Sequence, residues 1–126
     1  MKIDRLQIYN KCEGHCAYCG KEIMIKDMQV DHCYPKRLDN LYEWSEEVKN
    51  QRPSDIDNFN NLMPSCRRCN HYKRANTMEV FREMMQTLHE RIEKIYIVKL
   101  AIKYGIVAII PFDGVFYFEK YNANKQ

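Results

Sequence analysis

Long apolar runs, low-complexity tracts and internal repeats are absent from this sequence of 126 residues. Without a run of about 20 apolar residues, the chain is not expected to contain a membrane-spanning helix. Its mean hydropathy of −0.62 agrees with this expectation. The sequence opens with MKIDRLQIYN, which carries acidic and polar side chains where a signal peptide would have its apolar stretch. We therefore predict a cytoplasmic protein with no membrane partner.

A strong excess of one charge is also missing. The 20 Lys and Arg residues outnumber the 17 Asp and Glu residues, giving a net charge of +3 and a pI near 8.5. This mildly basic balance permits a phosphate-rich partner and does not require one. With 45% hydrophobic and 29% charged residues, the composition is that of a globular protein. The length suits one domain, which we predict over residues 1–126.

Cysteine, in contrast, is abundant: the chain has six, and four of them form two C-x2-C pairs. Disulfides are disfavoured in a reducing compartment, so paired cysteines indicate metal ligation. A C-x2-C turn places two sulfurs at the right distance for one tetrahedral zinc ion, and four thiolates leave no open position for a substrate. We predict a structural zinc site made by Cys16, Cys19, Cys66 and Cys69. The alternatives are buried free thiols, a redox pair, or ligation by Cys12.

Two short β-strands are predicted, one on each side of a polar segment. Residues 28–32 alternate in polarity and are followed by Pro35, and residues 61–64 form the second candidate strand. A helix is expected to begin near Cys66, so that the second cysteine pair lies at its N-terminus. Strands and helices together predict the α+β class.

The C-terminal part is predicted to be helical and then to end in a hairpin. Apolar residues recur at helical spacing over residues 81–95, and a second, buried helix or a continuation of the first is predicted up to Gly105. Asp113-Gly114 then separates the apolar stretches IVAII and VFYF. A DG pair between two such stretches predicts a β-hairpin.

Several motifs that are weak when taken singly form the array C-x2-C … V-D-H-x-x-P … N-L-x-P-x-C-x-x-C-N-x-x-K. This array resembles the zinc-containing branch of the HNH endonuclease family, and most of all its small, phage-type stand-alone members. The resemblance covers roughly residues 12–82, and residues 83–126 would be a helical and hairpin extension. The matching positions are Cys16, Cys19, Val30, Asp31, His32, Pro35, Asn61, Leu62, Pro64, Cys66, Cys69, Asn70 and Lys73.

The resemblance implies a ββα-metal fold, in which two short strands and a helix hold one divalent cation. It implies that His32 is the general base that takes a proton from water, a task for which a neutral imidazole is suited. Asp31 and Asn70 would be the ligands of a catalytic Mg²⁺ or Mn²⁺, because both offer hard oxygen donors. Asn61 would hold the loop between the strands and so orient His32. Some family members have a terminal His ligand where this chain has Arg74, so no third protein ligand is expected.

Basic residues gather around the proposed site, where they would neutralise phosphates of a DNA partner. The alternative is a solvated helix face, as most charge clusters are. The residues predicted to contact nucleic acid are Lys36, Arg37, Arg67, Arg68, Lys73 and Arg74.

The sequence thus predicts a metal-dependent HNH endonuclease that cuts or nicks DNA. The main alternative is a zinc-stabilised module that binds nucleic acid without cleaving it. A protein-interaction domain stapled by zinc and a thiol oxidoreductase are further alternatives. The oligomeric state is left open between a monomer, which would present one site, and a two-fold homodimer.

Overall fold

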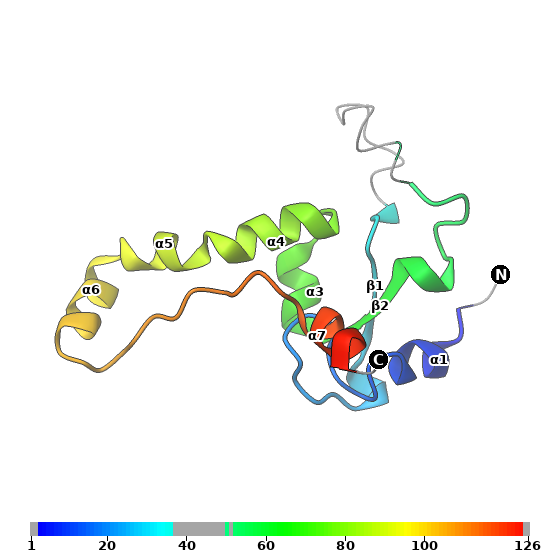
Figure 1. Cartoon of the computed structure of the whole chain (residues 1–126), viewed down its shortest axis with the longest axis horizontal. Helices are drawn as coiled ribbons and strands as arrows, with labels where there is room; N and C mark the ends of the chain where they lie inside the picture. Colours follow the sequence, from blue (N-terminus) through cyan, green and yellow to red (C-terminus); the bar gives the residue numbers. More distant parts are fainter. Residues whose placement is uncertain (1–2, 37–49, 51, 125–126) are drawn as a thin grey trace. The chain divides into compact units, whose positions relative to one another are not determined.

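The computed structural model describes residues 3–36, 50 and 52–124, and the chain divides into two compact units (Figure 1). Unit 1 joins Met1–Met78 to Phe116–Gln126, and unit 2 consists of Glu79–Val115. The α+β class is confirmed, because a two-stranded antiparallel sheet occurs together with several helices.

Unit 1 begins with helix α1 (Arg5–Asn10), which packs on the sheet through its apolar face. The Asp4 carboxylate caps this helix by accepting hydrogen bonds from the backbone N–H groups of Leu6 and Gln7. Ile8 of α1 is buried together with Met28 and Leu62 in the core of the unit. This small core holds α1 against the residues that lead into both strands.

The sheet consists of β1 (Gln29–His32) and β2 (Leu62–Ser65), each preceded by a short 3-10 helix, η1 (Ile25–Asp27) and η3 (Phe59–Asn61). In its antiparallel register, Asp31 pairs with Met63 and His32 with Leu62. Helix α3 (Arg67–Lys73) follows β2 directly. Both predicted strands and the helix expected near Cys66 are therefore confirmed.

Unit 2 contains α5 (Leu88–Glu93), α6 (Tyr96–Lys103) and most of α4 (Met78–Gln86). The single helix predicted over residues 81–95 is interrupted at Thr87, whose hydroxyl donates to the carbonyl of Glu83 at 3.0 Å. Helix α6 ends before Gly105, as predicted, but none of its residues is buried. No helix among the described residues is both long and apolar enough to cross a membrane.

The predicted β-hairpin is wrong. No strand forms among the residues described from 106 to 118, and Tyr117–Asn124 is a helix, α7. A turn does form at the DG pair, where Gly114 has a φ of +86° and the Asp113 carboxylate accepts from the N–H of Val115 at 3.0 Å. The chain then enters a helix because the Glu119 carboxylate caps it, accepting from the N–H of Phe116 at 2.9 Å.

Candidate functional site

The four paired cysteines come together in one cluster. Their Sγ atoms all lie within 4.8 Å of one another, and those of Cys19 and Cys66 are 3.9 Å apart. Sulfur atoms around a tetrahedral zinc ion are separated by about 3.8 Å, since the Zn–S bond is about 2.3 Å long. The cluster can therefore hold a metal ion, as the spacing of the pairs predicted.

Local backbone structure places each pair of sulfurs. The first pair lies on a tight turn in which the N–H of Gly20 donates to the carbonyl of Cys16 at 3.0 Å. Gly20 has a φ of +81°, a conformation that side chains rarely adopt. The second pair begins α3, where the Cys66 sulfur accepts from the N–H of Cys69 at 3.5 Å. A turn and a helix start thus meet across the cluster.

Hydrogen bonds among the sulfurs shift their pKa values in opposite directions. Hydrogen bonds with the thiols of Cys19 and Cys69 lower the pKa of Cys16. The hydrogen bond with Cys16 raises the pKa of Cys19 to about 11, and hydrogen bonds with Cys16 and Cys19 raise the pKa of Cys69. A bound cation would replace the shared protons, so metal binding is expected to release protons.

Helix α7 covers the first cysteine turn, a contact that the sequence did not predict. The backbone N–H groups of Tyr117 and Phe118 donate to the carbonyls of Tyr18 (3.1 Å) and Ala17 (2.7 Å). The ring of Phe116 packs edge-on against that of Tyr18, with the centroids 5.3 Å apart. The C-terminal helix therefore belongs to the metal-binding part of the chain.

A hollow of about 420 Å³ lies beside β1 and α3 in unit 1. Asp31, His32 and Asn70 all line it, although β1 and α3 are far apart in the sequence. These are the residues that were predicted to hold a catalytic cation and to activate water. The hollow is thus lined by residues that carry a carboxylate, an imidazole and an amide.

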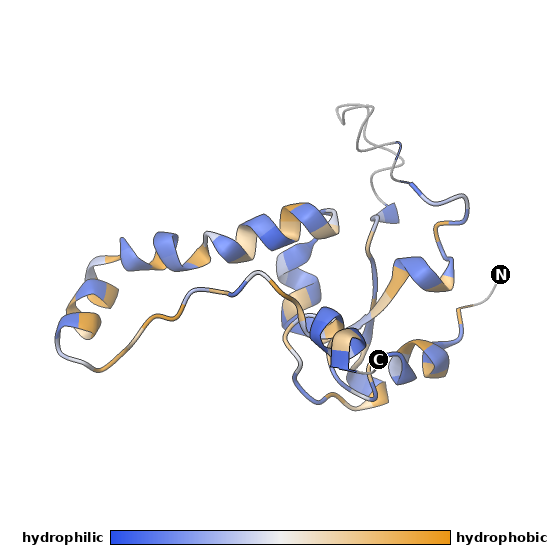
Figure 2. Ribbon diagram, viewed as in Figure 1, coloured by the Kyte–Doolittle hydropathy of each residue, from blue (hydrophilic) through white to orange (hydrophobic). Residues whose placement is uncertain are grey.

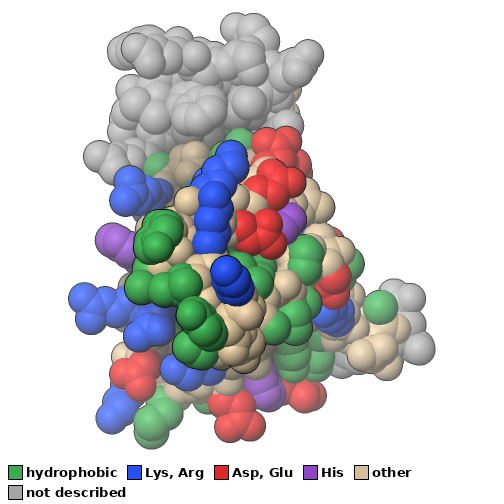
Figure 3. All heavy atoms as spheres, turned by 90° about the vertical axis from the view of Figure 1, so that its left-hand side faces the viewer, with side chains coloured by type: hydrophobic (Ala, Val, Ile, Leu, Met, Phe, Trp, Pro, Cys, Tyr) green, Lys and Arg blue, Asp and Glu red, His purple; other side chains and the backbone are tan. Residues whose placement is uncertain are grey.

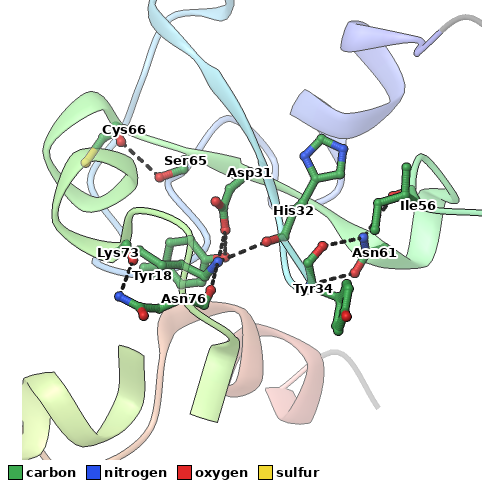
Figure 4. A network of polar contacts seen from close by, with 10 residues as sticks. All are labelled: Tyr18, Asp31, His32, Tyr34, Ile56, Asn61, Ser65, Cys66, Lys73 and Asn76. Carbon is green, nitrogen blue, oxygen red and sulfur yellow. Dashed lines mark hydrogen bonds and ion pairs between the residues drawn. The ribbon is translucent and has the colours of Figure 1, made fainter. Parts of the chain in front are cut away.

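Asp31 is buried and held by a network of polar contacts (Figure 4). The Tyr18 hydroxyl donates to Asp31 Oδ2, and Lys73 Nζ lies 3.1 Å from the same oxygen. Lys73 Nζ also donates to the carbonyls of His32 (2.9 Å) and Asn76 (2.7 Å). Burial raises the pKa of the Asp31 carboxyl, and the Lys73 ammonium opposes that increase. The network leaves Oδ1 of Asp31 without a partner among the described residues.

The predicted contact between Lys73 and nucleic acid is wrong. Its side chain is completely buried, and its ammonium is occupied by Asp31 and two carbonyls. A phosphate has no access to it. Lys73 instead links α3 to β1 at the floor of the site.

His32 is held by a carboxylate that the sequence analysis missed. Its Nε2 lies 2.8 Å from Oδ1 of Asp57, and its ring points away from the contact between Lys73 and Asp31 (Figure 4). The hydrogen bond from His32 lowers the pKa of Asp57, and the ammonium of Lys36 lowers it further. An ionised Asp57 accepts a hydrogen bond from Nε2–H, which leaves Nδ1 as the nitrogen of the neutral ring that carries a lone pair. No spacing rule connects residues 32 and 57, so the sequence carried no signal for this pair.

Asn61 uses both ends of its amide to join two segments. Its Oδ1 accepts from the N–H of Tyr34 at 2.8 Å, and its Nδ2 donates to the carbonyls of Tyr34 (3.1 Å) and Ile56 (2.8 Å). Tyr34 follows His32 in the chain, and Ile56 precedes Asp57. The amide therefore connects the two segments that carry the His32–Asp57 pair.

The other basic residues predicted to bind nucleic acid lie in different places. Lys36 and Arg74 line the hollow that contains His32. Arg67 and Arg68 line a larger hollow, of about 980 Å³, beside the cysteine cluster. Arg37 lies outside the described residues.

Compared with protein families, curated proteins and solved structures, the chain matches no family model, no curated protein and no solved structure.

Proposed function

We propose that this chain is a metal-dependent HNH endonuclease that hydrolyses DNA phosphodiester bonds. The observation that carries the proposal is the hollow lined jointly by Asp31, His32 and Asn70. Hydrolysis of a phosphodiester needs a base for water, positive charge near the phosphate and help for the leaving oxygen. The residues of this hollow include a candidate for each of the first two requirements.

His32 is the proposed general base. Its hydrogen bond with Asp57 holds the proton on Nε2 and leaves Nδ1 to accept a proton from water. The Asn61 amide supports this role, because it joins the segments before Asp57 and after His32. The hydrogen bonds of Asn61 with Tyr34 and Ile56 support the role predicted for it, which is to orient the base.

Asp31 and Asn70 are the proposed ligands of the catalytic cation. Carboxylate and amide oxygens are the donors that Mg²⁺ and Mn²⁺ prefer. The contacts of Asp31 with Tyr18 and Lys73 involve Oδ2, so Oδ1 can serve a cation. When bound, such a cation supplies positive charge for the phosphate and the leaving oxygen.

The cysteine cluster is proposed to hold zinc in a structural role. Four thiolates favour zinc over harder ions and fill its coordination shell. The cluster joins the first cysteine turn to the start of α3, so the ion would stabilise the element that carries Asn70.

DNA is the proposed partner, and the hollow that contains His32 is the proposed place of contact. Lys36 and Arg74 line that hollow and can neutralise phosphates next to the base. Arg67 and Arg68 line the second hollow and would extend the contact along the backbone of DNA.

A module that binds nucleic acid without cleavage is the alternative, and one observation favours it. The ammonium of Lys73 already neutralises the carboxylate of Asp31, so that carboxylate attracts a divalent cation less strongly than a free one. In this alternative, Lys36, Arg74, Arg67 and Arg68 bind phosphate and His32 has no chemical role.

Cleavage of supercoiled plasmid with Mg²⁺ or Mn²⁺ tests the proposal. Wild type should nick or linearise the plasmid, and His32→Ala and Asn70→Ala should each lose most of the activity. Asn60→Ala is a matched amide control, because Asn60 is exposed on η3 and does not line the hollow that contains His32. Wild type that shifts DNA in a gel but never cuts it would establish the binding-only alternative.

Metal removal in this assay needs care, because EDTA competes for the cysteine cluster as well. The arm without catalytic metal is therefore prepared by omitting Mg²⁺ and Mn²⁺ from zinc-loaded protein. Zinc content measured by elemental analysis shows that the cluster is intact in both arms.

A further inference from the structure

Unit 2 exposes an unusual amount of apolar surface. Helix α6 and the segment after it contain large apolar side chains that are 38% to 86% exposed, whereas such residues usually form a core. We call residues 95–110 the apolar arm. Figure 2 shows hydrophobic residues along the arm, and Figure 3, viewed from the side on which α6 lies in Figure 1, shows hydrophobic side chains at the surface beside Lys and Arg. The exposed residues are Ile95, Tyr96, Ile97, Leu100, Ile102, Tyr104, Ile106, Val107 and Ile110.

Beyond Val107, the backbone of the arm has no hydrogen-bond partner in the described part of the chain. The N–H groups of Ile106 and Val107 return to the carbonyl of Ala101 at the end of the helix. Ala108, Ile109 and Ile110 make no backbone hydrogen bond with any described residue. The run IVAII has high β-propensity but no strand beside it in the described part of the chain. Apolar β-branched residues with open backbone groups are the signature of a strand that pairs with another chain.

We propose that the apolar arm is a homodimer interface, in which residues 106–110 pair antiparallel with the same residues of a second copy. A two-fold axis through Ala108 places Ile106 opposite Ile110 and Val107 opposite Ile109. Every pair except the central one then consists of β-branched residues, which make favourable cross-strand contacts. The partner is a second copy because, in this antiparallel pairing, the apolar side chains of one segment face those of the other. The open backbone groups of each segment also face donors and acceptors of its partner.

The area of the arm agrees with a dimer. With about 150 Å² for each Tyr and roughly 100 Å² for each aliphatic side chain, the exposed fractions leave on the order of 600 Å² per copy. This is at the lower end of the area of about 600–1,000 Å² that each partner contributes to a standard interface. A folded neighbour of the same chain would cover it without further components.

Other partners fit the arm less well. Lys99 and Lys103 are the only charged residues in the arm, too few for a nucleic-acid surface. A lipid surface would cover the side chains but would leave the backbone groups of Ala108, Ile109 and Ile110 unpaired in an apolar medium. A paired strand satisfies both requirements.

Sedimentation equilibrium of the full, zinc-loaded chain tests the interface. We expect a dimer of twice 15.2 kDa that dissociates in the micromolar range. Ile106→Lys and Ile110→Lys should each weaken dimerisation by about tenfold or more, because they place a charge within the paired strands. Leu6→Lys is the matched control, since Leu6 is 56% exposed on α1 in unit 1. Equal weakening by the control would overturn the proposal, as would a native chain that stays monomeric up to about 100 µM.

Cross-linking tests the register with the native apolar residues in place. In the proposed pairing, the Ala108→Cys variant places two introduced thiols directly opposite each other, within the Cα separation of about 4.4–6.8 Å that a disulfide requires. It should form a covalent dimer on mild oxidation, above the background of the native chain. Val107→Cys should not, because its thiol lies opposite Ile109. Equal cross-linking by both variants would overturn the register, and a monomer that sediments with phosphatidylserine vesicles would replace the second copy with a lipid surface.

Discussion

Lys73 Nζ lies 3.1 Å from Asp31 Oδ2, and both side chains are buried. A lysine with no exposed surface is rare unless a partner balances its charge. Asp31 belongs to β1 and Lys73 to α3, the two elements that line the hollow with His32. The pair therefore holds together the elements on which the proposed active site depends.

Replacing Lys73 by Met should destabilise the protein strongly. The change leaves the Asp31 carboxylate buried without its cation, and breaking a buried pair in this way costs about 3–5 kcal/mol. Urea unfolding of zinc-loaded protein measures the loss. Lys26→Met, at an exposed lysine of η1, is the control and should change stability by less than about 0.5 kcal/mol. A similar small loss for Lys73→Met would show that the pair is not held in solution.

Replacing Asp57 by Asn should reduce plasmid cleavage and leave stability almost unchanged. An amide at this position can donate to His32 Nε2, which favours the wrong tautomer of the ring. Removing the hydrogen-bond partner of a metal ligand typically costs about 10–100-fold in activity, and we expect a loss of similar size here. Cleavage rates at saturating Mg²⁺ measure the effect. Glu93→Gln, on α5, is the control, because it changes an exposed carboxylate to an amide elsewhere in the chain. If Asp57→Asn cleaves plasmid as fast as Glu93→Gln does, Asp57 has no part in the mechanism.

Replacing Cys66 by Ser should remove the bound zinc. Cys66 supplies one of the four sulfurs and also caps α3, so the variant loses a ligand while the Ser hydroxyl can still cap that helix. Elemental analysis should find about one zinc ion per native chain and far less in the variant. Cys33→Ser is the control, because Cys33 is not in the cluster and its loss should leave zinc content intact. Zinc retained by Cys66→Ser would show that the four sulfurs are not its ligands.

Replacing Gly20 by Ala should destabilise unit 1 by more than about 1 kcal/mol, since a φ of +81° is unfavourable for Ala. In addition, the new Cβ would lie 2.6 Å from Cδ1 of Tyr117. Thermal unfolding measures the loss. The double variant Gly20→Ala/Tyr117→Ala separates the two causes, because it removes the clash and keeps the backbone strain. If the stability losses of the two single variants simply add up in the double variant, Tyr117 does not contact this turn in solution.

Local chemistry made the cysteine cluster and the sheet predictable. A C-x2-C turn has a fixed geometry, so two such turns predict four sulfurs around one point, and the sulfurs of Cys16, Cys19, Cys66 and Cys69 do meet. The first strand was predictable because its polarity alternates over residues 28–32, and the second because residues 61–64 form a short, largely apolar stretch that ends at a proline. The helix after Cys66 followed from the same kind of local pattern.

Contacts between distant segments were not predictable in the same way. Lys73 looked like an exposed member of a basic cluster because its partner, Asp31, lies in another element. Asp57 carried no motif, and only the fold brings it to His32. The hairpin prediction failed because the aromatic residues after Gly114 pack on the first cysteine turn and donate backbone hydrogen bonds to it. Those N–H groups are therefore not paired with the stretch IVAII.

The contact between α7 and the first cysteine turn makes unit 1 discontinuous in the sequence. During synthesis, the turn that carries Cys16 and Cys19 leaves the ribosome long before the helix that covers it. The unit that carries the cysteine cluster therefore reaches its final form only after translation has passed through unit 2. The same arrangement makes Glu79–Val115 an insertion within a unit whose own residues line both hollows.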